Sequence, residues 1–274
     1  MPEALPPSSP VVGLRDVQQL WTELGARDPL WAVLSIPEKK GNLWSPDEFF
    51  ATGVADVSRI IRWIDRIGIA RPRGRALDFG CGVGRLTQAL AAHFNEVWGV
   101  DIAPSMIDGA RRLDRTDGRC RYVVNSTADL ASFEDASFAF ILSLIVLQHL
   151  DPEYIRGYVR EFVRLLAPGG LLVFQLPAEW VPSGPVERRR STWRRVLRAV
   201  VPGVALRWYR AFRRPPVFEA GTGAAMHAIG REEVEAIVRD AGGRVRAVDA
   251  DDAAGQNWIS LRYCVLREPG PSTA

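Results

Sequence analysis

Three closely spaced glycines form the segment of this sequence whose chemistry is clearest. They lie in Asp78-Phe79-Gly80-Cys81-Gly82-Val83-Gly84, directly after the apolar run of residues 76–79 and before a predicted helix. Glycine lacks a Cβ atom, so the backbone of such a turn can approach a ligand closely and adopt angles that other residues avoid. The spacing is G-x-G-x-G, whereas the dinucleotide fingerprint G-x-G-x-x-G would need a glycine at Arg85. The turn therefore favours an adenosyl ligand over NAD(P).

A carboxylate stands at the end of the next predicted strand. Asp101 closes the apolar run of residues 97–101, and a carboxylate in that position can accept hydrogen bonds from both hydroxyls of a ribose. Taken alone, Asp101 could also be a carboxylate that stabilises the N-terminus of a helix. The combination with the glycine turn makes the ribose interpretation the more specific one.

The sequence contains only three histidines, whose pKa suits a general base near neutral pH. His149 follows the fourth predicted strand, at the sheet edge where ligands bind in open α/β folds, and we predict it to be catalytic. The alternative is a histidine in the pocket wall. His227 ends a long insertion and could reach an acceptor from there, although a packing role is open as well. His93 closes a helix, where it would interact with the helix dipole.

The elements that must position these residues alternate in type along the chain. Short apolar runs separated by helices indicate a parallel sheet covered on both faces. We expect strands over residues 76–79, 97–101, 122–124, 138–142, 171–176, 245–248 and 258–266, and helices over 85–94, 105–113, 152–166 and 231–241. The fold class is therefore α/β, a doubly wound seven-stranded sheet with the last strand antiparallel.

The predicted domain organisation follows from the remaining segments. Residues 1–10 form a flexible N-terminus and residues 268–274 a flexible tail, because both are rich in Pro, Ser or Gly. Residues 11–70 form a helical N-terminal cap. Residues 71–267 form one catalytic domain, with a lid insertion at 177–229.

These motifs resemble those of class I S-adenosylmethionine-dependent methyltransferases, particularly the small-molecule branch that includes enzymes of ubiquinone and menaquinone biosynthesis. The resemblance covers residues 75–176 and continues through Asp135-Ala136-Ser137-Phe138, through residues 146–150 and through residues 164–170. It implies a Rossmann-like methyltransferase sheet with S-adenosyl-L-methionine as cofactor. It also implies that Gly80, Gly82 and Gly84 line the methionine side of the cofactor, that Asp101 binds its ribose, and that Ile102 and Met106 contact its adenine.

The predicted cofactor-binding set extends beyond those residues. Arg85 and Thr52 are candidates for the methionine carboxylate. The family commonly has an aspartate after the third strand, where this chain has Asn125-Ser126-Thr127, so we expect Ser126, Thr127 or a backbone group to contact the adenine. A second departure is Ala139, at a position where the family usually has an aspartate. The set is completed by Asp78, Cys81, Ser143 and Leu144, and Trp44, Phe49 and Phe50 are candidates for a roof over the cofactor.

The segment from Arg188 to Arg214 is rich in arginine, and aromatic residues lie between the arginines. Such a segment can contact an anionic membrane or an acidic substrate, or it can simply be a solvated helix face. The fourth strand ends in Ser143-Leu144-Ile145 and lacks the Asn/Asp-Pro-Pro-Tyr type of loop that acts on planar amino groups. We therefore expect no nucleic-acid partner.

Composition excludes several further classes. No apolar run approaches the roughly 20 residues of a membrane span, and the N-terminus does not have the pattern of a signal peptide, so we predict a cytoplasmic protein. Three cysteines without C-x-x-C spacing predict neither a disulfide framework nor a zinc site, and we expect no metal. A net charge of +3 is too small to indicate nucleic-acid binding.

The expected function is methyl transfer to a small-molecule acceptor, first of all to a hydroxyl of a natural product, a sugar or a lipid-linked compound. Transfer to nitrogen or carbon ranks next. A nucleotide-dependent oxidoreductase is the rival enzyme class, and the glycine spacing argues against it. A non-catalytic module that binds membrane or RNA through the arginine-rich segment is the non-enzymatic rival. The identity of the acceptor and the oligomeric state are not encoded in any motif.

Overall fold

The computed structural model describes residues 13–181, 224–255 and 257–268. The predicted flexible N-terminus, most of the predicted lid, the whole arginine-rich segment and residues 269–274 of the predicted tail lie outside the described residues. The division into domains therefore stays a prediction.

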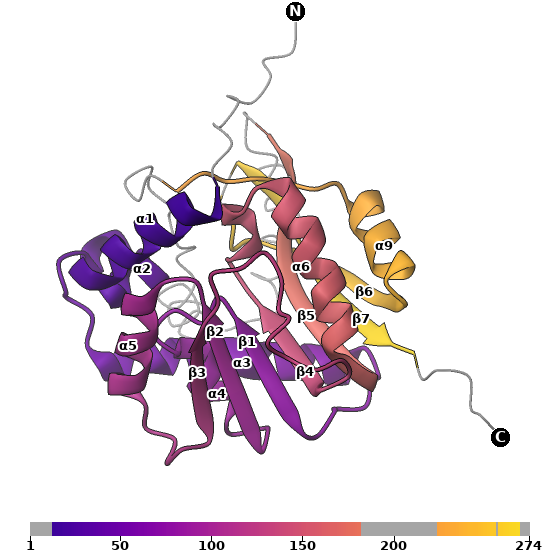
Figure 1. Ribbon diagram of the computed structural model, residues 1–274, viewed down its shortest axis with the longest axis horizontal. Helices are drawn as coiled ribbons and strands as arrows, with labels where there is room; N and C mark the ends of the chain where they lie inside the picture. The colour runs from indigo at the N-terminus through magenta and orange to yellow at the C-terminus, as the bar shows by residue number, and fades with distance from the viewer. Residues whose placement is uncertain (1–12, 182–223, 256, 269–274) are drawn as a thin grey trace, which may run out of the picture.

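A single seven-stranded sheet has the order β3-β2-β1-β4-β5-β7-β6 (Figure 1). Its strands are β1 (Arg75–Phe79), β2 (Glu96–Asp101), β3 (Cys120–Val124), β4 (Phe138–Ser143), β5 (Leu166–Trp180), β6 (Gly243–Asp251) and β7 (Trp258–Arg267). The first five strands pair in parallel, whereas β7 runs antiparallel to both β5 and β6. The predicted fold class is thereby confirmed, including the antiparallel last strand.

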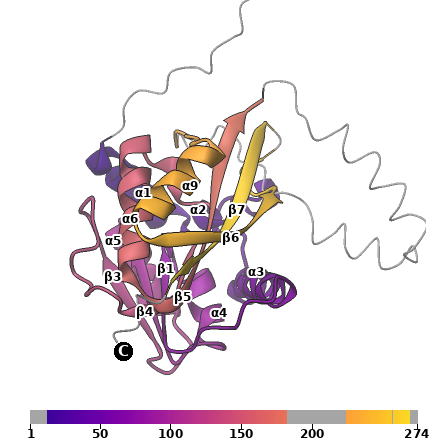
Figure 2. The same ribbon diagram turned by 90° about the vertical axis from the view of Figure 1, so that its right-hand side faces the viewer.

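Helices cover both faces of the sheet, because consecutive strand residues point to opposite sides. Leu77 and Ile141 pack with α6 (Pro152–Leu165) and α9 (Arg231–Asp240) in one core cluster. Ala76 and Phe140 pack with α3 (Pro46–Arg66), α4 (Arg85–Leu90) and α5 (Pro104–Leu113) in the other. Figure 2 shows α6 and α9 on one side of the sheet and α3 on the other.

The N-terminal helices divide between two locations. α3 packs on α4 and contributes Trp63 and Ile64 to the core, so it belongs to the cover of the sheet. α1 (Leu14–Arg27) and α2 (Pro29–Val33) lie beside α5, near the carboxyl ends of β1 and β2 (Figure 1). Two hydrogen bonds fix α1 there: the Ser105 Oγ donates to the Thr22 carbonyl at 2.7 Å, and the Gln18 Nε2 donates to the Ile102 carbonyl at 3.0 Å.

Several element boundaries differ from the prediction, most of all that of β5. This strand begins at Leu166, which pairs with Phe138, and continues to Trp180, which pairs with Trp258 of β7. Residues 177–180 therefore belong to the sheet and not to an insertion. The long partner strand β7 supplies the hydrogen bonds for this extension, a contact between segments far apart in the sequence. None of the helices in the described ranges is long and apolar enough to span a bilayer.

Candidate active site

A pocket opens at the carboxyl ends of β1, β2 and β4, the edge where parallel α/β sheets bind ligands. Its walls enclose about 970 Å³ of empty space, part of which is open solvent. The glycine turn, the end of β2 and the loop after β4 form its walls. Helices α1 and α2 contribute Val17, Trp21 and Val33 from above.

The glycine turn is held against β2 and bends sharply into the pocket. The backbone N–H groups of Gly80 and Cys81 donate to the Val100 carbonyl at 2.7 and 3.0 Å. Gly80 and Gly82 have φ angles of +76° and +53°, and both residues line the pocket. A Cβ atom on Gly80 would lie 2.2 Å from Val146, so this position has room for glycine only.

Gly84 does not line the pocket, in contrast to the prediction. It is the N-cap of α4, and a Cβ atom there would meet the Tyr122 hydroxyl at 2.7 Å. The third glycine therefore serves the packing of the turn against β3.

The Asp101 carboxylate connects the two halves of the motif. Its Oδ2 accepts from the Gly82 N–H at 2.8 Å, and its Oδ1 accepts from the Ala103 N–H at 2.9 Å. Burial raises the pKa of Asp101, and these hydrogen bonds oppose the rise because they stabilise the ionised form. Asp101 lines the pocket, as do Ile102 and Met106.

Arg85 also lines the pocket, but its guanidinium is already paired on one side. Its Nη1 lies 2.6 Å from the Asp56 carboxylate and 3.1 Å from the Thr52 hydroxyl, whereas its buried Nε has no hydrogen-bond partner. The Thr52 hydroxyl donates to the Phe49 carbonyl and does not line the pocket. Thr52 thus orients Arg85, and the predicted direct contact with a cofactor is not supported.

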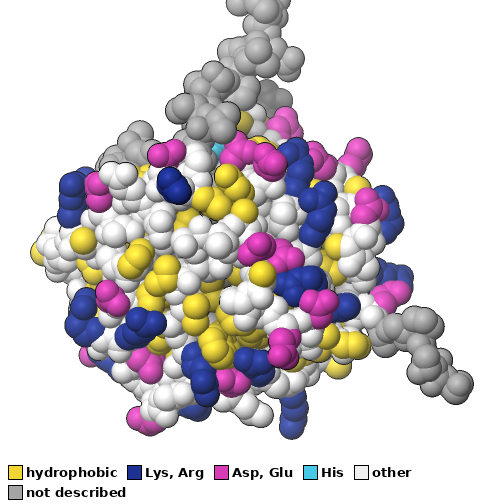
Figure 3. Space-filling model, viewed as in Figure 1, with side chains coloured by type: hydrophobic (Ala, Val, Ile, Leu, Met, Phe, Trp, Pro, Cys, Tyr) yellow, Lys and Arg dark blue, Asp and Glu magenta, His cyan; other side chains and the backbone are white. Residues whose placement is uncertain are grey.

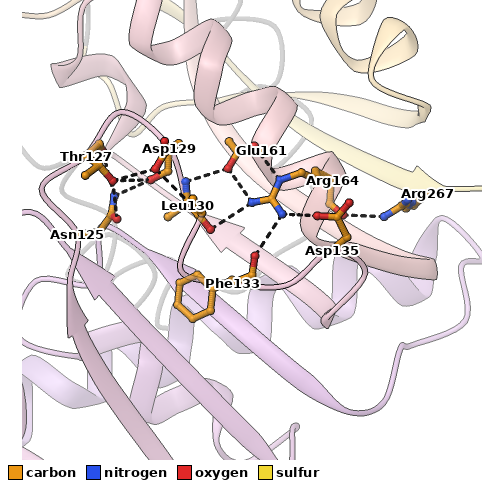
Figure 4. Close-up of polar contacts among 10 residues, drawn as sticks. Asn125, Thr127, Asp129, Leu130, Phe133, Asp135, Glu161, Arg164 and Arg267 are labelled. Atoms are coloured by element: carbon orange, nitrogen blue, oxygen red, sulfur yellow. Dashed lines mark hydrogen bonds and ion pairs between the residues drawn. The ribbon is translucent and has the colours of Figure 1, made fainter.

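Of the three residues that follow the third strand, Asn125 lines the pocket, whereas the predicted Ser126 and Thr127 do not. The Thr127 hydroxyl bonds to Asp129, and the Asn125 Nδ2 donates to the carbonyls of Thr127 and Asp129 (Figure 4). The side chain of Thr127 is therefore committed to the turn and not to a ligand.

The segments around Asp135 and Arg164, which carry part of the family resemblance, hold the same loop in place. Arg164 forms ion pairs with Asp135 and Glu161 and donates to the carbonyls of Leu130 and Phe133 (Figure 4). These contacts tie the loop after β3 to α6. The residues that carry the resemblance there have a structural role at some distance from the pocket lining.

The loop after β4 enters the pocket with Leu144 and Ile145. Ser143 is fully buried within β4, does not line the pocket, and has a hydroxyl without a hydrogen-bond partner. Ile145 has a φ of +62°, the left-handed region that β-branched residues avoid at a cost of about 1–3 kcal/mol. A strained residue in a pocket wall is typical of functional sites.

His149 lies in the pocket wall on the short helix η2 (Leu147–His149). Its ring packs edge-on against Trp21, with 5.4 Å between the ring centroids. Its Nδ1 is 3.1 Å from the Ala225 carbonyl and its Nε2 is 3.3 Å from the Gln148 Nε2. Because a carbonyl only accepts, Nδ1 carries the proton and Nε2 accepts from Gln148. Burial lowers the pKa of His149 to about 4, so the ring is neutral at pH 7.

The structure does not bring His227 to the pocket lining. Its backbone N–H donates to the Gln148 carbonyl at 2.7 Å, while its Nε2 is buried without a hydrogen-bond partner. Burial lowers the pKa of His227 as well. Its predicted catalytic role is not supported, because the residue packs behind η2.

Sequence reasoning missed the roof of the pocket. Trp21 of α1 lines it, whereas the predicted roof residues Trp44 and Phe49 do not and are buried in a cluster with Met106, against which Trp21 also packs. The Trp44 Nε1 donates to the Leu34 carbonyl at 3.1 Å. The amphipathic pattern of α1 marks a buried face but does not say what that face covers.

The pKa of His149 predicts a pH-dependent contribution to stability. The unfolded chain, with a histidine pKa of about 6.5, binds a proton between about pH 4 and 6.5 that the folded protein does not bind. The contribution of His149 to the free energy of unfolding should therefore rise with pH across this window, by up to about 3 kcal/mol. We expect the difference between wild type and His149→Gln in urea unfolding to be larger at about pH 7 than at about pH 4.5.

Asp78 makes the comparison with a variant necessary. Burial raises the pKa of Asp78 to about 6, so its contribution is present below about pH 4 and is lost as the pH rises through about 6. The two opposing effects overlap in the wild-type curve, but only the effect of His149 differs between the two proteins. His93→Gln is the control: His93 is exposed, and although partial burial lowers its pKa as well, it should change the slope less than the fully enclosed His149. Equal slopes for wild type and His149→Gln would contradict the lowered pKa.

Within the described residues, no group of three or more His, Cys, Asp or Glu side chains is arranged to hold a metal ion. The three cysteines are buried and unpaired.

Comparison with known proteins places this site in a family. A model of the methyltransferase domain matches residues 77–174, which contain the glycine turn, Asp101 and the loop after β4. A ubiquinone biosynthesis O-methyltransferase of Xanthomonas campestris pv. campestris is 36% identical over 106 residues, which are 38% of this chain and 43% of that protein. A 2-methyl-6-phytyl-1,4-hydroquinone methyltransferase of Synechocystis sp. is 27% identical over 161 residues, 58% of this chain and 48% of that protein. The matches span less than half the length of these curated relatives.

The fold has a close counterpart among solved structures. Magnesium protoporphyrin IX methyltransferase from Synechocystis PCC 6803, in its structure with bound SAH, superimposes with a TM-score of 0.59 at 16% identity. The comparison covers 93% of this chain and 99% of that one. At this identity the likeness concerns the fold. Residues 77–174 match the methyltransferase domain, and the chain is similar over this domain to class I S-adenosylmethionine-dependent methyltransferases.

Proposed function

We propose that this chain transfers the methyl group of S-adenosylmethionine to a small-molecule acceptor, with a hydroxyl oxygen as the first candidate. The observation that carries the proposal is the pocket in which the glycine turn, the Asp101 carboxylate and an apolar wall meet. The relatives that act in ubiquinone biosynthesis as O-methyltransferases support the choice of oxygen.

The residues present fit the cofactor. Arg85 lines the pocket, and its buried Nε lacks a hydrogen-bond partner, so a methionine carboxylate that reached this guanidinium would satisfy it. Asp101 would accept the ribose hydroxyls, because each carboxylate oxygen has lone pairs beyond those used by the backbone. Ile102 and Met106 offer apolar contacts to an adenine ring. When bound, S-adenosylmethionine supplies an electrophilic methyl group on a sulfonium.

The chain itself contributes alignment and the exclusion of water. Trp21, Val17 and Val33 cover the pocket with apolar surface, which keeps water from the reacting atoms and holds an acceptor in place. His149 stays our candidate for the general base, since its neutral ring stands in the pocket wall. A pKa of about 4 makes it a weak base, however, and its Nε2 must first release Gln148. Unchanged turnover in His149→Ala would reduce it to a wall residue.

The apolar lining favours an acceptor with an uncharged apolar or aromatic body. Leu14, Val17 and Trp21 surround the part of the pocket nearest α1, and the described lining contains a single cationic side chain, Arg85, which is already paired with Asp56. An acceptor that is methylated at nitrogen or carbon and has a similar apolar body would fit equally well. The methyl-transfer assay with different acceptors therefore decides which atom receives the methyl group. The arginine-rich segment at residues 188–214 remains our proposed contact with an anionic membrane or an acidic substrate.

A nucleic-acid acceptor is not favoured. On the described part of the face in Figure 3, side chains of both charge signs are interspersed, without a continuous basic surface of the kind that binds phosphate backbones. This part of the surface fits a small-molecule acceptor.

Calorimetric titration with S-adenosylhomocysteine, beside a titration with NADH, tests the proposed function. We expect S-adenosylhomocysteine to bind with a Kd of about 1–100 μM and NADH to show no saturable binding, because the turn lacks the dinucleotide spacing. Methyl transfer is then measured with a panel of phenols, amines and carbon acids. Binding of NADH in preference to S-adenosylhomocysteine would overturn the proposal in favour of an oxidoreductase.

A further inference from the structure

The strained residue in the pocket wall is held by a side chain from a different strand. Ile145, with its left-handed backbone, directs its N–H to the Gln175 Oε1 of β5 at 3.0 Å. Gln175 is fully buried. A buried acceptor at this distance stabilises the left-handed conformation, because any rotation of the Ile145 peptide would leave the Ile145 N–H and the Gln175 carbonyl without a partner.

The orientation of the Gln175 amide is fixed by its remaining contacts. Its Nε2 donates to the Ser260 hydroxyl at 2.6 Å and to the Gln148 Oε1 at 3.2 Å. Both partners are buried as well. With both amide hydrogens engaged, the carbonyl oxygen of Gln175 can only face Ile145.

The same network reaches a second part of the pocket wall. Because the Gln148 Oε1 accepts from Gln175, the Gln148 Nε2 is the donor toward the His149 Nε2. The polarity of this chain of hydrogen bonds agrees with the proton on Nδ1 that the Ala225 carbonyl requires. Gln175 is thus connected by hydrogen bonds to two residues of the pocket wall. It bonds directly to Ile145 and reaches His149 through Gln148.

We propose that Gln175 is a positioning residue of the active site, which holds Ile145 in its strained conformation and keeps the His149 ring in one orientation. Gln175 itself does not line the pocket. The proposal rests on the proposed function of the pocket as a cofactor site. It assigns to a buried polar residue of the sheet a role that an apolar core residue could not fill.

A double-mutant cycle tests the proposal, with the variants Gln175→Met, Ile145→Gly and the two combined. We expect Gln175→Met to weaken S-adenosylhomocysteine binding by about tenfold, because Ile145 then leaves its position in the wall. Glycine adopts the left-handed conformation without strain. In the Ile145→Gly background the same substitution should therefore weaken binding by less than about threefold. Gln19→Met, at an exposed glutamine of α1, is the matched control.

A second measurement does not depend on binding. Hydrogen exchange of the Ile145 amide should accelerate by about tenfold or more in Gln175→Met, while the amides of β1 keep their protection. If the wild type fails to bind S-adenosylhomocysteine, the proposed function is wrong, and the exchange data still decide the role of Gln175. Should Gln175→Met not fold, Ser260→Ala is used, which removes one anchor of the amide and should show the same changes at smaller size. Unchanged exchange at Ile145, or equal effects of Gln175→Met in both backgrounds, would overturn the inference.

Discussion

Asp101→Ala is expected to weaken the binding of S-adenosylhomocysteine by about 100-fold or more. The substitution removes the acceptor for the ribose hydroxyls and also leaves the N–H groups of Gly82 and Ala103 without their partner. Each lost hydrogen bond to a charged group is worth about 1.5–3 kcal/mol, so even two of them account for this factor. Asp101→Asn keeps one carbonyl acceptor but presents an amide N–H₂ to one of the two backbone donors, and it should fall between wild type and alanine.

The measurement is calorimetric titration at one ionic strength, with folding of each variant verified by circular dichroism. Asp108→Ala is the matched control, since Asp108 lies on the exposed face of α5 and, among the described residues, pairs with Arg111. Wild-type affinity in Asp101→Ala would mean that the carboxylate merely braces the glycine turn. A loss of affinity in Asp108→Ala of similar size would instead point to a general effect of charge.

The glycine turn and Asp101 could be predicted because their signal is local. Both follow directly on buried strands, and parallel strands place their carboxyl ends at one edge of the sheet. The structure accordingly joins the Gly82 backbone to the Asp101 carboxylate across two adjacent strands. The same alternation of strands and helices predicted the seven-stranded sheet, which the structure confirms.

The roof of the pocket could not be predicted, because it depends on contacts between distant segments. Trp21 reaches the site because Ser105 and Ile102 anchor α1. Both residues lie more than eighty positions away in the sequence. Nothing in the local sequence distinguishes Trp21 from Trp44, which is buried elsewhere. The proposed role of Gln175 could not be predicted either, because it depends on hydrogen bonds to three other segments.

Side-chain chemistry at loop positions was the least predictable feature. Ser126 and Thr127 have the hydroxyls expected of an adenine contact, yet Thr127 uses its own in a turn with Asp129. Ser, Thr, Asn and Asp often bond to their own loop, and this competes with ligand binding. Asn125, one residue earlier, lines the pocket, although its amide nitrogen also donates to carbonyls of the same loop.

Gly82→Ala should have the second large effect, and its cause can be separated into two parts. A Cβ atom on Gly82 would lie 2.4 Å from the Val33 Cγ2, while the other atoms of Val33 are no closer than 3.7 Å. The clash would push α2 away from the turn, and we expect the free energy of unfolding to fall by about 2–3 kcal/mol and S-adenosylhomocysteine binding to be lost. The positive φ of Gly82 adds a smaller backbone cost of about 1 kcal/mol.

The combination Gly82→Ala with Val33→Ala isolates the steric part, because removal of the Val33 methyl groups leaves no contact below 3.7 Å. Most of the stability lost in Gly82→Ala should return, reduced by the small cost of Val33→Ala alone. Gly118→Ala is the control for the backbone part, since Gly118 has a φ of +80° and no atom within 4 Å of the added Cβ. Urea unfolding and the titration are measured on wild type, Gly82→Ala, Val33→Ala, the combination and Gly118→Ala. If Val33→Ala restores neither stability nor binding, the glycine is required for the backbone conformation or for direct contact with the ligand, and the packing of α2 on the turn is not what the position protects.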